Sequence, residues 1–233
     1  MVLVPGFTQT ASSWRGVVEI VEQTCEVVAL DVPVRETFGQ TASALGTRGR
    51  AGVYVGYSMG GRLCLRTALD RPDVVTALVL VGASPGIADE GERAARRASD
   101  EALAAEIERV GTAAFLEQWL ARPMFSTFTP APADMDARLA NTSRGLATAL
   151  RRLGPGAQEP LWDRLGELEM PVLVVAGQDD AKFTHIAEEM ADAIGVNAQV
   201  VALAGAGHAA HLERPGSFCR LLAAFLVLHP ATS

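Results

Sequence analysis

The chain has 233 residues, of which 49% are hydrophobic and 20% are charged. A chain of this length forms one domain with a large core and has room for an insertion, but it is too short for two full catalytic domains. Its formal net charge of −7 at pH 7 argues against nucleic acid or a membrane surface as a partner, because there is no basic excess to meet phosphates. A few local arginines could nevertheless bind a small anionic substrate.

Short runs rich in Val and Leu alternate with longer helical patterns along the chain. The runs are predicted strands and span residues 1–4, 25–30, 52–55, 76–81, 171–176 and 198–203. Helices are predicted near residues 12–22 and at 60–68, 183–194 and 215–228. Nearly continuous apolar strands that alternate with helices are typical of a mostly parallel sheet covered on both faces. The sequence therefore predicts a doubly wound α/β fold.

One long segment, from about Gly86 to Leu168, breaks this alternation. It holds no convincing strand, and its pattern is helical, rich in Ala, Glu and Arg and interrupted by prolines. An all-helical block between two core strands predicts a lid over the edge of the sheet. The expected organisation is a core of residues 1–85 and 169–233 with a helical lid of residues 86–168.

The cysteines and the chain ends indicate a cytoplasmic protein. Cys25, Cys64 and Cys219 are odd in number, widely spaced and without a CxxC pair, which predicts free thiols in a reducing compartment. The first residues lack the basic segment of a signal peptide, and the longest apolar stretch, Leu221–Leu228, is too short to span a membrane. We expect no membrane or nucleic-acid partner, and the sequence leaves the oligomeric state open.

Residues 56–60 form the motif Gly-Tyr-Ser-Met-Gly, which follows a predicted strand and opens a helix. The pattern GxSxG alone arises by chance in such a chain with a probability of about 0.1, so its weight comes from this strand–turn–helix context. A tight turn there holds the serine backbone in a strained conformation, and the glycines let neighbouring segments approach. The motif predicts Ser58 as a nucleophile above the carboxyl edge of the sheet.

A serine nucleophile needs a base, and four histidines are available. His208 follows the last strand in a Gly-rich loop, so it is the favoured base. His211 leads into a helix and is expected to be structural, while His185 and His229 belong to helices.

The acid that orients this base is expected after the strand at residues 171–176. Asp179 and Asp180 both follow it, and the Gly-x-x-Asp spacing favours Asp180. The order serine, acid, histidine is the one used by α/β-hydrolases. The alternative for either aspartate is a helix N-cap.

An oxyanion hole for this nucleophile needs two backbone N–H groups. The residue after the nucleophile, Met59, supplies one of them. Phe7, in the loop after the first strand, is the expected second donor. A simple turn at Pro5–Gly6 is the alternative interpretation of that loop.

Several further stretches carry a more specific pattern: GYSMGGR at 56–62, GASPGI at 82–87, ERAARRASD at 92–100, WLARPMF at 119–125, AGQDDAKF at 176–183 and GHAAHLERP at 207–215. Together they resemble 2-succinyl-6-hydroxy-2,4-cyclohexadiene-1-carboxylate synthase of menaquinone biosynthesis. The resemblance implies an α/β-hydrolase fold and a lyase in which a Ser–His–Asp triad removes a ring proton and pyruvate is eliminated. It implies no metal and no organic cofactor.

The resemblance also implies substrate contacts from Tyr57, Arg62, Arg96 and Trp119. Chemistry supports Arg62 separately, because it lies one helical turn after Ser58 and its planar guanidinium suits a carboxylate. The alternative is a surface arginine on an amphipathic helix.

The lid residues have equally plain alternatives. Arg93, Arg96 and Arg97 stand among acidic residues that would simply pair with them, and Trp119 would fit a lid core. Arg138 is a weaker candidate for another carboxylate contact.

The chain departs from the family pattern near its N-terminus. Pro5 stands where the family has His before Gly-Phe, and the usual β-hairpin before the first strand is expected to be missing. Two other functions remain open: a carboxylesterase or carbon–carbon bond hydrolase on the same scaffold, and a non-catalytic ligand-binding protein that retains the fold.

Overall fold

Six parallel strands form one sheet in the order β2-β1-β3-β4-β5-β6. In the computed structural model, which describes residues 1–229, the strands are β1 (Val2–Val4), β2 (Val28–Ala29), β3 (Gly52–Tyr57), β4 (Val75–Val81), β5 (Val172–Gly177) and β6 (Ala198–Leu203). All six predicted strands are present, which confirms the predicted fold class. The edge strand β2 is much shorter than the predicted 25–30, and it pairs on one side only, with β1. The last four residues of the predicted core segment 169–233 lie outside the described part.

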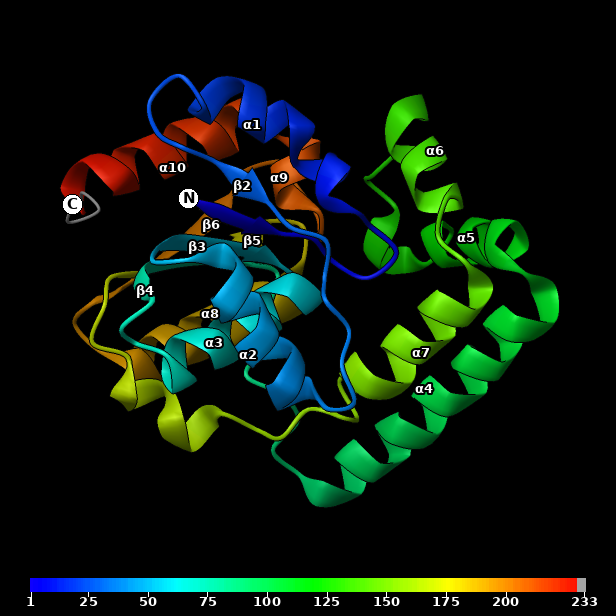
Figure 1. Cartoon of the computed structure of the whole chain (residues 1–233). Coiled ribbons are helices and arrows are strands. Elements are labelled where there is room, and N and C mark those ends of the chain that lie inside the picture. Colours follow the sequence, from blue (N-terminus) through cyan, green and yellow to red (C-terminus); the bar gives the residue numbers. More distant parts are fainter. Residues whose placement is uncertain (230–233) are drawn as a thin grey trace.

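Helices cover both faces of the sheet (Figure 1). One face carries the short helix η1 (Ala11–Trp14), α1 (Arg15–Val21), α9 (Ala210–Glu213) and α10 (Pro215–Leu228), and the other carries α2 (Phe38–Gly49), α3 (Met59–Asp70) and α8 (Ala181–Ile194). Strand side chains alternate between the two layers: Val53 and Val55 pack under α1 and α10, and Tyr54 packs against the opposite layer. The sequence did not predict α2, whose three glycines are weak helix formers.

The segment between β4 and β5 is helical. It contains α4 (Glu90–Val110), α5 (Thr112–Leu120), η2 (Pro123–Phe125), α6 (Pro132–Leu139), α7 (Ser143–Leu153) and η3 (Trp162–Glu167). The long helices α4 and α7 lie side by side (Figure 1), and with α5 they enclose a separate apolar cluster around Ile107, Phe115 and Leu150. In contrast, η3 returns to the sheet, where Leu165 belongs to the main core. Below, the helices α4–α7 are called the lid helices.

The topology brings four loops to one edge of the sheet. The parallel strands β1, β3, β5 and β6 all end there, and these ends are followed by Phe7, Ser58, Asp180 and His208 respectively. This edge is where open α/β sheets bind ligands. Within residues 1–229, no helix is long and apolar enough to cross a membrane.

Candidate active site

The turn between β3 and α3 holds Ser58 in a strained backbone conformation, with φ 49° and ψ −110°. The flanking glycines make this turn possible. A Cβ on Gly56 would lie 2.6 Å from the backbone oxygen of Gly60, and a Cβ on Gly60 would overlap the backbone oxygens of Val4 and Pro5. The first turn of α3 therefore packs directly on β1 and β3, and the serine projects from the sheet edge.

The three side chains predicted as a triad lie in contact. His208 Nδ1 is 2.7 Å from Asp180 Oδ2, and His208 Nε2 is 3.4 Å from Ser58 Oγ. The other carboxylate oxygen of Asp180 accepts a hydrogen bond from the backbone N–H of Phe183 and caps α8. The carboxylate is thus fixed at a helix N-terminus, where negative charge is favoured. Asp179 is exposed and contacts the His208 loop only through its backbone, with its N–H donating to Ala206.

The loop that carries His208 is held by a residue that sequence reasoning did not single out. The Glu213 carboxylate accepts hydrogen bonds from the backbone N–H groups of Gly207 and Ala209, one on each side of the histidine. The imidazole itself is only 2% exposed, and the Phe183 ring lies 4.5 Å away, centroid to centroid. The position of the His208 ring is therefore set by the hydrogen bonds of Glu213 to the neighbouring backbone and by packing against Phe183.

The remaining histidines lie apart from this contact. His211 is completely buried between the rings of Trp14 and Tyr57, at centroid distances of 4.3 and 4.5 Å. Burial lowers the pKa of His211 to about 3, with smaller contributions from Arg138 and His208, so the ring is neutral. His185 is exposed beside Glu189, and His229 lies at the end of α10. His211 occupies a packing position, as the sequence predicted.

Two backbone N–H groups of residues that line the cavity of Ser58 have no backbone or side-chain acceptor in the described part of the chain. Met59 is the first residue of α3, so its N–H has no partner within the helix. In the described residues, no acceptor engages the N–H of Phe7, whose loop is braced by a hydrogen bond from Gly6 N–H to the side chain of Gln9. Both residues line the same cavity as Ser58. This arrangement suits stabilisation of a developing oxyanion.

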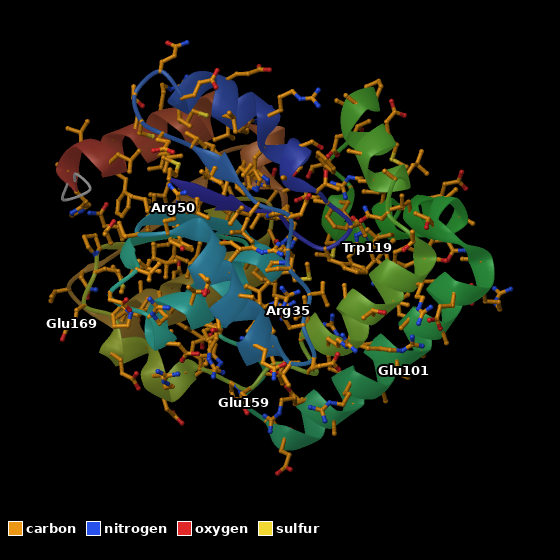
Figure 2. The ribbon with its side chains drawn as sticks, in the orientation of Figure 1. Arg35, Arg50, Glu101, Trp119, Glu159 and Glu169 are labelled. Carbon is orange, nitrogen blue, oxygen red and sulfur yellow. The ribbon has the colours of Figure 1, made fainter. Side chains whose placement is uncertain are left out.

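A cavity of about 830 Å³ opens between the sheet edge and the lid helices. Its wall includes Ser58, Asp180 and His208 from the core and Trp119 and Leu150 from the lid. The Trp119 ring packs edge-on against Phe7 with 5.3 Å between centroids, which joins the lid to the loop after the first strand. Figure 2 shows Trp119 beside the lid helices. The side chains of Ser58, Asp180 and His208 therefore line a pocket between the core and the lid helices.

Two predicted arginines reach this cavity, one from the core and one from the lid helices. Arg62, on α3, is 7% exposed and donates to Gln158 Oε1 at 2.8 Å and to the backbone oxygen of Leu153 at 2.7 Å. Both acceptors are neutral, and burial lowers the pKa of Arg62, helped by the charge of Arg96. Arg96, on α4, pairs with the buried carboxylate of Asp100 at 2.8 Å. Arg62 thus brings a buried positive charge to the wall, and the nearby carboxylate of Asp100 acts on it by raising its pKa.

Similarity to known proteins agrees with this geometry. The sequence profile of the alpha/beta hydrolase family matches residues 1–221. The chain belongs to the alpha/beta hydrolase family. It is 37% identical, over 74% of its length, to a Bacillus subtilis protein assigned as 2-succinyl-6-hydroxy-2,4-cyclohexadiene-1-carboxylate synthase, and 33% identical, over 74% of its length, to the synthase of Serratia proteamaculans. The matched regions span 64% and 67% of those two proteins, so the chain covers about two thirds of their length.

A solved structure gives a closer overall match. This hydrolase-family chain superimposes on MenH from S. aureus with a TM-score of 0.90 and 28% identity, over 98% of its own length and 94% of the other. The chain therefore resembles these synthases in both sequence and fold.

Other predicted residues of this hydrolase-family member lie outside the cavity wall. Tyr57 is 3% exposed and packs against His208 and His211. Arg138 is 2% exposed and is engaged by Asp134 at 2.8 Å and by the hydroxyl of Thr8. Their side chains act through packing and internal pairing.

The cavity also contains residues that sequence reasoning missed. Arg122 lines the wall and stacks over the Trp119 ring at 4.3 Å, and Lys182 lies at the exposed side near Asp180. The sequence offered one indication that Arg122 belongs to the site: it stands three residues after Trp119, in the stretch at 119–125 that carries the family resemblance. Within residues 1–229, no group of three or more His, Cys, Asp or Glu side chains is arranged to hold a metal ion.

Proposed function

We propose that this protein is a lyase that eliminates pyruvate from an enolpyruvyl cyclohexene polycarboxylate to give 2-succinyl-6-hydroxy-2,4-cyclohexadiene-1-carboxylate in menaquinone biosynthesis. The observation that carries the proposal is the cavity itself, which combines the Ser58–His208–Asp180 contact with the buried guanidinium of Arg62, a group that suits a substrate carboxylate. The similarity to named synthases supports the same assignment.

In the proposed mechanism, Asp180 orients His208 through Nδ1, and Nε2 draws the hydroxyl proton of Ser58. The Ser58 oxygen then takes a proton from a ring carbon of the substrate. General base catalysis of this kind contributes about 10²–10⁴ in rate. The strained turn keeps the serine oxygen at the cavity wall, so little reorganisation is needed.

The remaining bonds then rearrange in one elimination. The C–H electron pair forms a ring double bond, and the C–O bond to the enolpyruvyl group breaks. The leaving group departs as the enolate of pyruvate and takes up the proton that the base removed, so no water, metal or redox partner is consumed. In the proposal, the backbone N–H groups of Phe7 and Met59, which line the cavity, stabilise the negative charge that develops on the oxygen of the departing enolate.

Substrate binding is assigned to the charged and aromatic walls. In the proposal Arg62 and Arg96 bind carboxylates, Trp119 packs against the ring, and Tyr57 supports His208 from behind. Helices within residues 86–168 serve as a lid over a core of residues 1–85 and 169–233.

The proposed partner is therefore a small anionic substrate and not nucleic acid or a membrane. We also place the protein in the cytoplasm, in keeping with the free thiols of Cys25, Cys64 and Cys219.

Pyruvate release from the enolpyruvyl substrate, coupled to lactate dehydrogenase, tests the proposal. Wild type is expected to release one pyruvate per substrate, and Ser58→Ala to be slower by about 10²–10⁴. Purified, folded protein that releases no pyruvate while hydrolysing simple esters rapidly would rule the lyase out.

The same site favours one alternative, a carboxylesterase or carbon–carbon bond hydrolase. The specific observation is that Ser58 Oγ, His208 and two free N–H groups also suit an acyl-enzyme. Fluorophosphonate labelling of Ser58 followed by turnover of p-nitrophenyl esters would support it. A protein that only binds ligands would neither release pyruvate nor hydrolyse esters.

A further inference from the structure

Three guanidinium groups reach the cavity from three different elements. Arg62 comes from α3 of the core, Arg96 from the lid helix α4, and Arg122 from the residue that caps η2. Two of them already have partners, because Arg62 donates to neutral oxygens and Arg96 pairs with Asp100. Arg122 differs from both.

The guanidinium of Arg122 packs on an aromatic ring. Its Cζ atom lies over the Trp119 ring at 4.3 Å from the centroid, a cation–π contact that restricts the side chain. Among residues 1–229, no carboxylate lies within ion-pair distance of it, and its side chain makes no hydrogen bond. The five N–H donors of this half-buried group are therefore free for a ligand.

Two neighbouring charges act on the pKa of Arg122 in opposite directions. Partial burial lowers its pKa, and the neighbouring Arg96 lowers it further, whereas Asp100 raises it. Arg96 acts on the pKa of Arg62 in the same way, so the three cations share one region of the cavity.

Each carboxylate of the wall already has a hydrogen-bonding partner. Asp100 binds Arg96 and the backbone N–H of Gly156, Glu106 binds Arg109, and Asp180 binds His208. The wall carries the four cations Arg62, Arg96, Arg122 and Lys182 against the three carboxylates, so it has an excess of positive charge in a chain whose net charge is −7. Cations gathered against the overall charge of a protein are stabilised when an anion occupies the site.

We propose that Arg122, packed on Trp119, binds a further carboxylate of the substrate and so makes the site selective for polycarboxylates over monocarboxylates. The inference rests on the proposed function for the view that this cavity is the substrate site, and it adds a residue to the carboxylate contacts of Arg62 and Arg96. Arg62 binds from the core side, and Arg122 binds another carboxylate from the lid side. The free N–H groups of Arg122 suit a planar two-point contact with a carboxylate.

Two rigid aromatic acids test the inference without reference to turnover. Benzene-1,3,5-tricarboxylate has three carboxylates on a six-membered ring, and benzoate has one. Their dissociation constants are measured by calorimetry for wild type, Arg122→Gln and Arg122→Lys. The control is Arg144→Gln, which removes the same charge from an exposed position on α7 outside the cavity.

Wild type is expected to bind the tricarboxylate more tightly than benzoate. Arg122→Gln is expected to raise the dissociation constant of the tricarboxylate by about tenfold or more, because a charge-assisted contact is lost. The dissociation constant of benzoate should change by less than about twofold. Arg122→Lys is expected to be intermediate, since it keeps the charge and loses the planar fork. Arg144→Gln should behave as wild type, and thermal melts check that all variants are folded.

Three results would overturn the inference: no binding of the tricarboxylate by wild type, equal binding by Arg122→Gln, or equal weakening by Arg144→Gln. The pyruvate assay separates this failure from failure of the proposed function. Pyruvate release with an unchanged KM in Arg122→Gln would leave the lyase standing and remove the role of Arg122. Tricarboxylate binding that depends on Arg122, without pyruvate release, would keep the role of Arg122 and rule out the lyase.

Discussion

Arg62, one helical turn beyond the nucleophile, donates a hydrogen bond of 2.7 Å to the backbone oxygen of Leu153 at the end of the lid helix α7. A second N–H of the same guanidinium reaches Gln158, in the connection back to the core. One buried cation therefore joins the helix of the nucleophile to the lid. If Arg62 also binds the substrate as proposed, substrate binding and the position of the lid helices are coupled at this residue.

Arg62→Met should affect both stability and substrate binding. Two buried carbonyl oxygens lose a charged donor, which is expected to lower the free energy of unfolding by about 1–3 kcal/mol. We also expect KM for the enolpyruvyl substrate to rise about tenfold or more, because a charge-assisted contact to a carboxylate is lost. Urea titration and steady-state pyruvate release measure the two effects. Arg66→Met, on the same helix but outside the cavity, is the control, and equal effects in both variants would contradict the assignment.

Asp180→Asn should leave the fold intact and remove most of the activity. Asparagine also caps helices, so α8 keeps its N-terminal hydrogen bond, and the melting temperature should change little. The amide no longer holds His208 in the required tautomer, so kcat is expected to fall by about 10³–10⁴. The exposed neighbour Asp179→Asn provides the comparison, and its activity should match wild type. Loss in Asp179→Asn instead would reassign the acid.

His211→Phe should flatten the pH dependence of stability on the acid side. The folded-state pKa of His211 is lowered to about 3, whereas the unfolded value is near 6.5, so the unfolded chain binds the extra proton between these two values. The contribution of His211 is thus fully present above pH 6.5 and is lost as the pH falls towards 3.

Between pH 7.5 and pH 5.0 this loss amounts to about 2 kcal/mol. Urea titrations at the two pH values give the difference in the free energy of unfolding between them, and this difference should be smaller in His211→Phe than in wild type by about that amount. The exposed His185→Phe should retain the full pH dependence of wild type. The same slope in His211→Phe and wild type would mean that His211 is protonated in the folded state.

Gly60→Ala should be strongly destabilising, and Gly16→Ala should not. A methyl group on Gly60 would overlap the backbone oxygens of Val4 and Pro5, which cannot move without separating α3 from β1. The expected loss is more than about 3 kcal/mol, and soluble yield would fall with it. A Cβ on Gly16, in α1, would have no atom within 4 Å, so alanine there should raise the free energy of unfolding by about 0.5–1 kcal/mol. Thermal melts of both variants make the comparison.

Local pattern was enough to predict the sheet and the groups at its edge. The six apolar strands, the strand–turn–helix context of Ser58 and the Gly-rich loop of His208 are short-range features, and parallel topology brings their ends together. The choice between Asp179 and Asp180 followed from spacing alone, and the structure shows Asp180 at His208. The helix α2 was missed because its glycines and threonines give a weak local signal.

The sequence by itself determined which residue types stand at the ends of the strands, because a strand and the turn that follows it are set by neighbours in the chain. Only the tertiary structure decided what each arginine does. Arg138 pairs with Asp134 and Arg122 packs on Trp119, neighbours three or four residues away, whereas Arg62 donates to Leu153 from 91 residues away. Within residues 1–229, Arg122 has no carboxylate at ion-pair distance. The sequence cannot show which guanidinium is buried, which reaches a distant acceptor and which is left free, because these properties depend on how separate segments pack together.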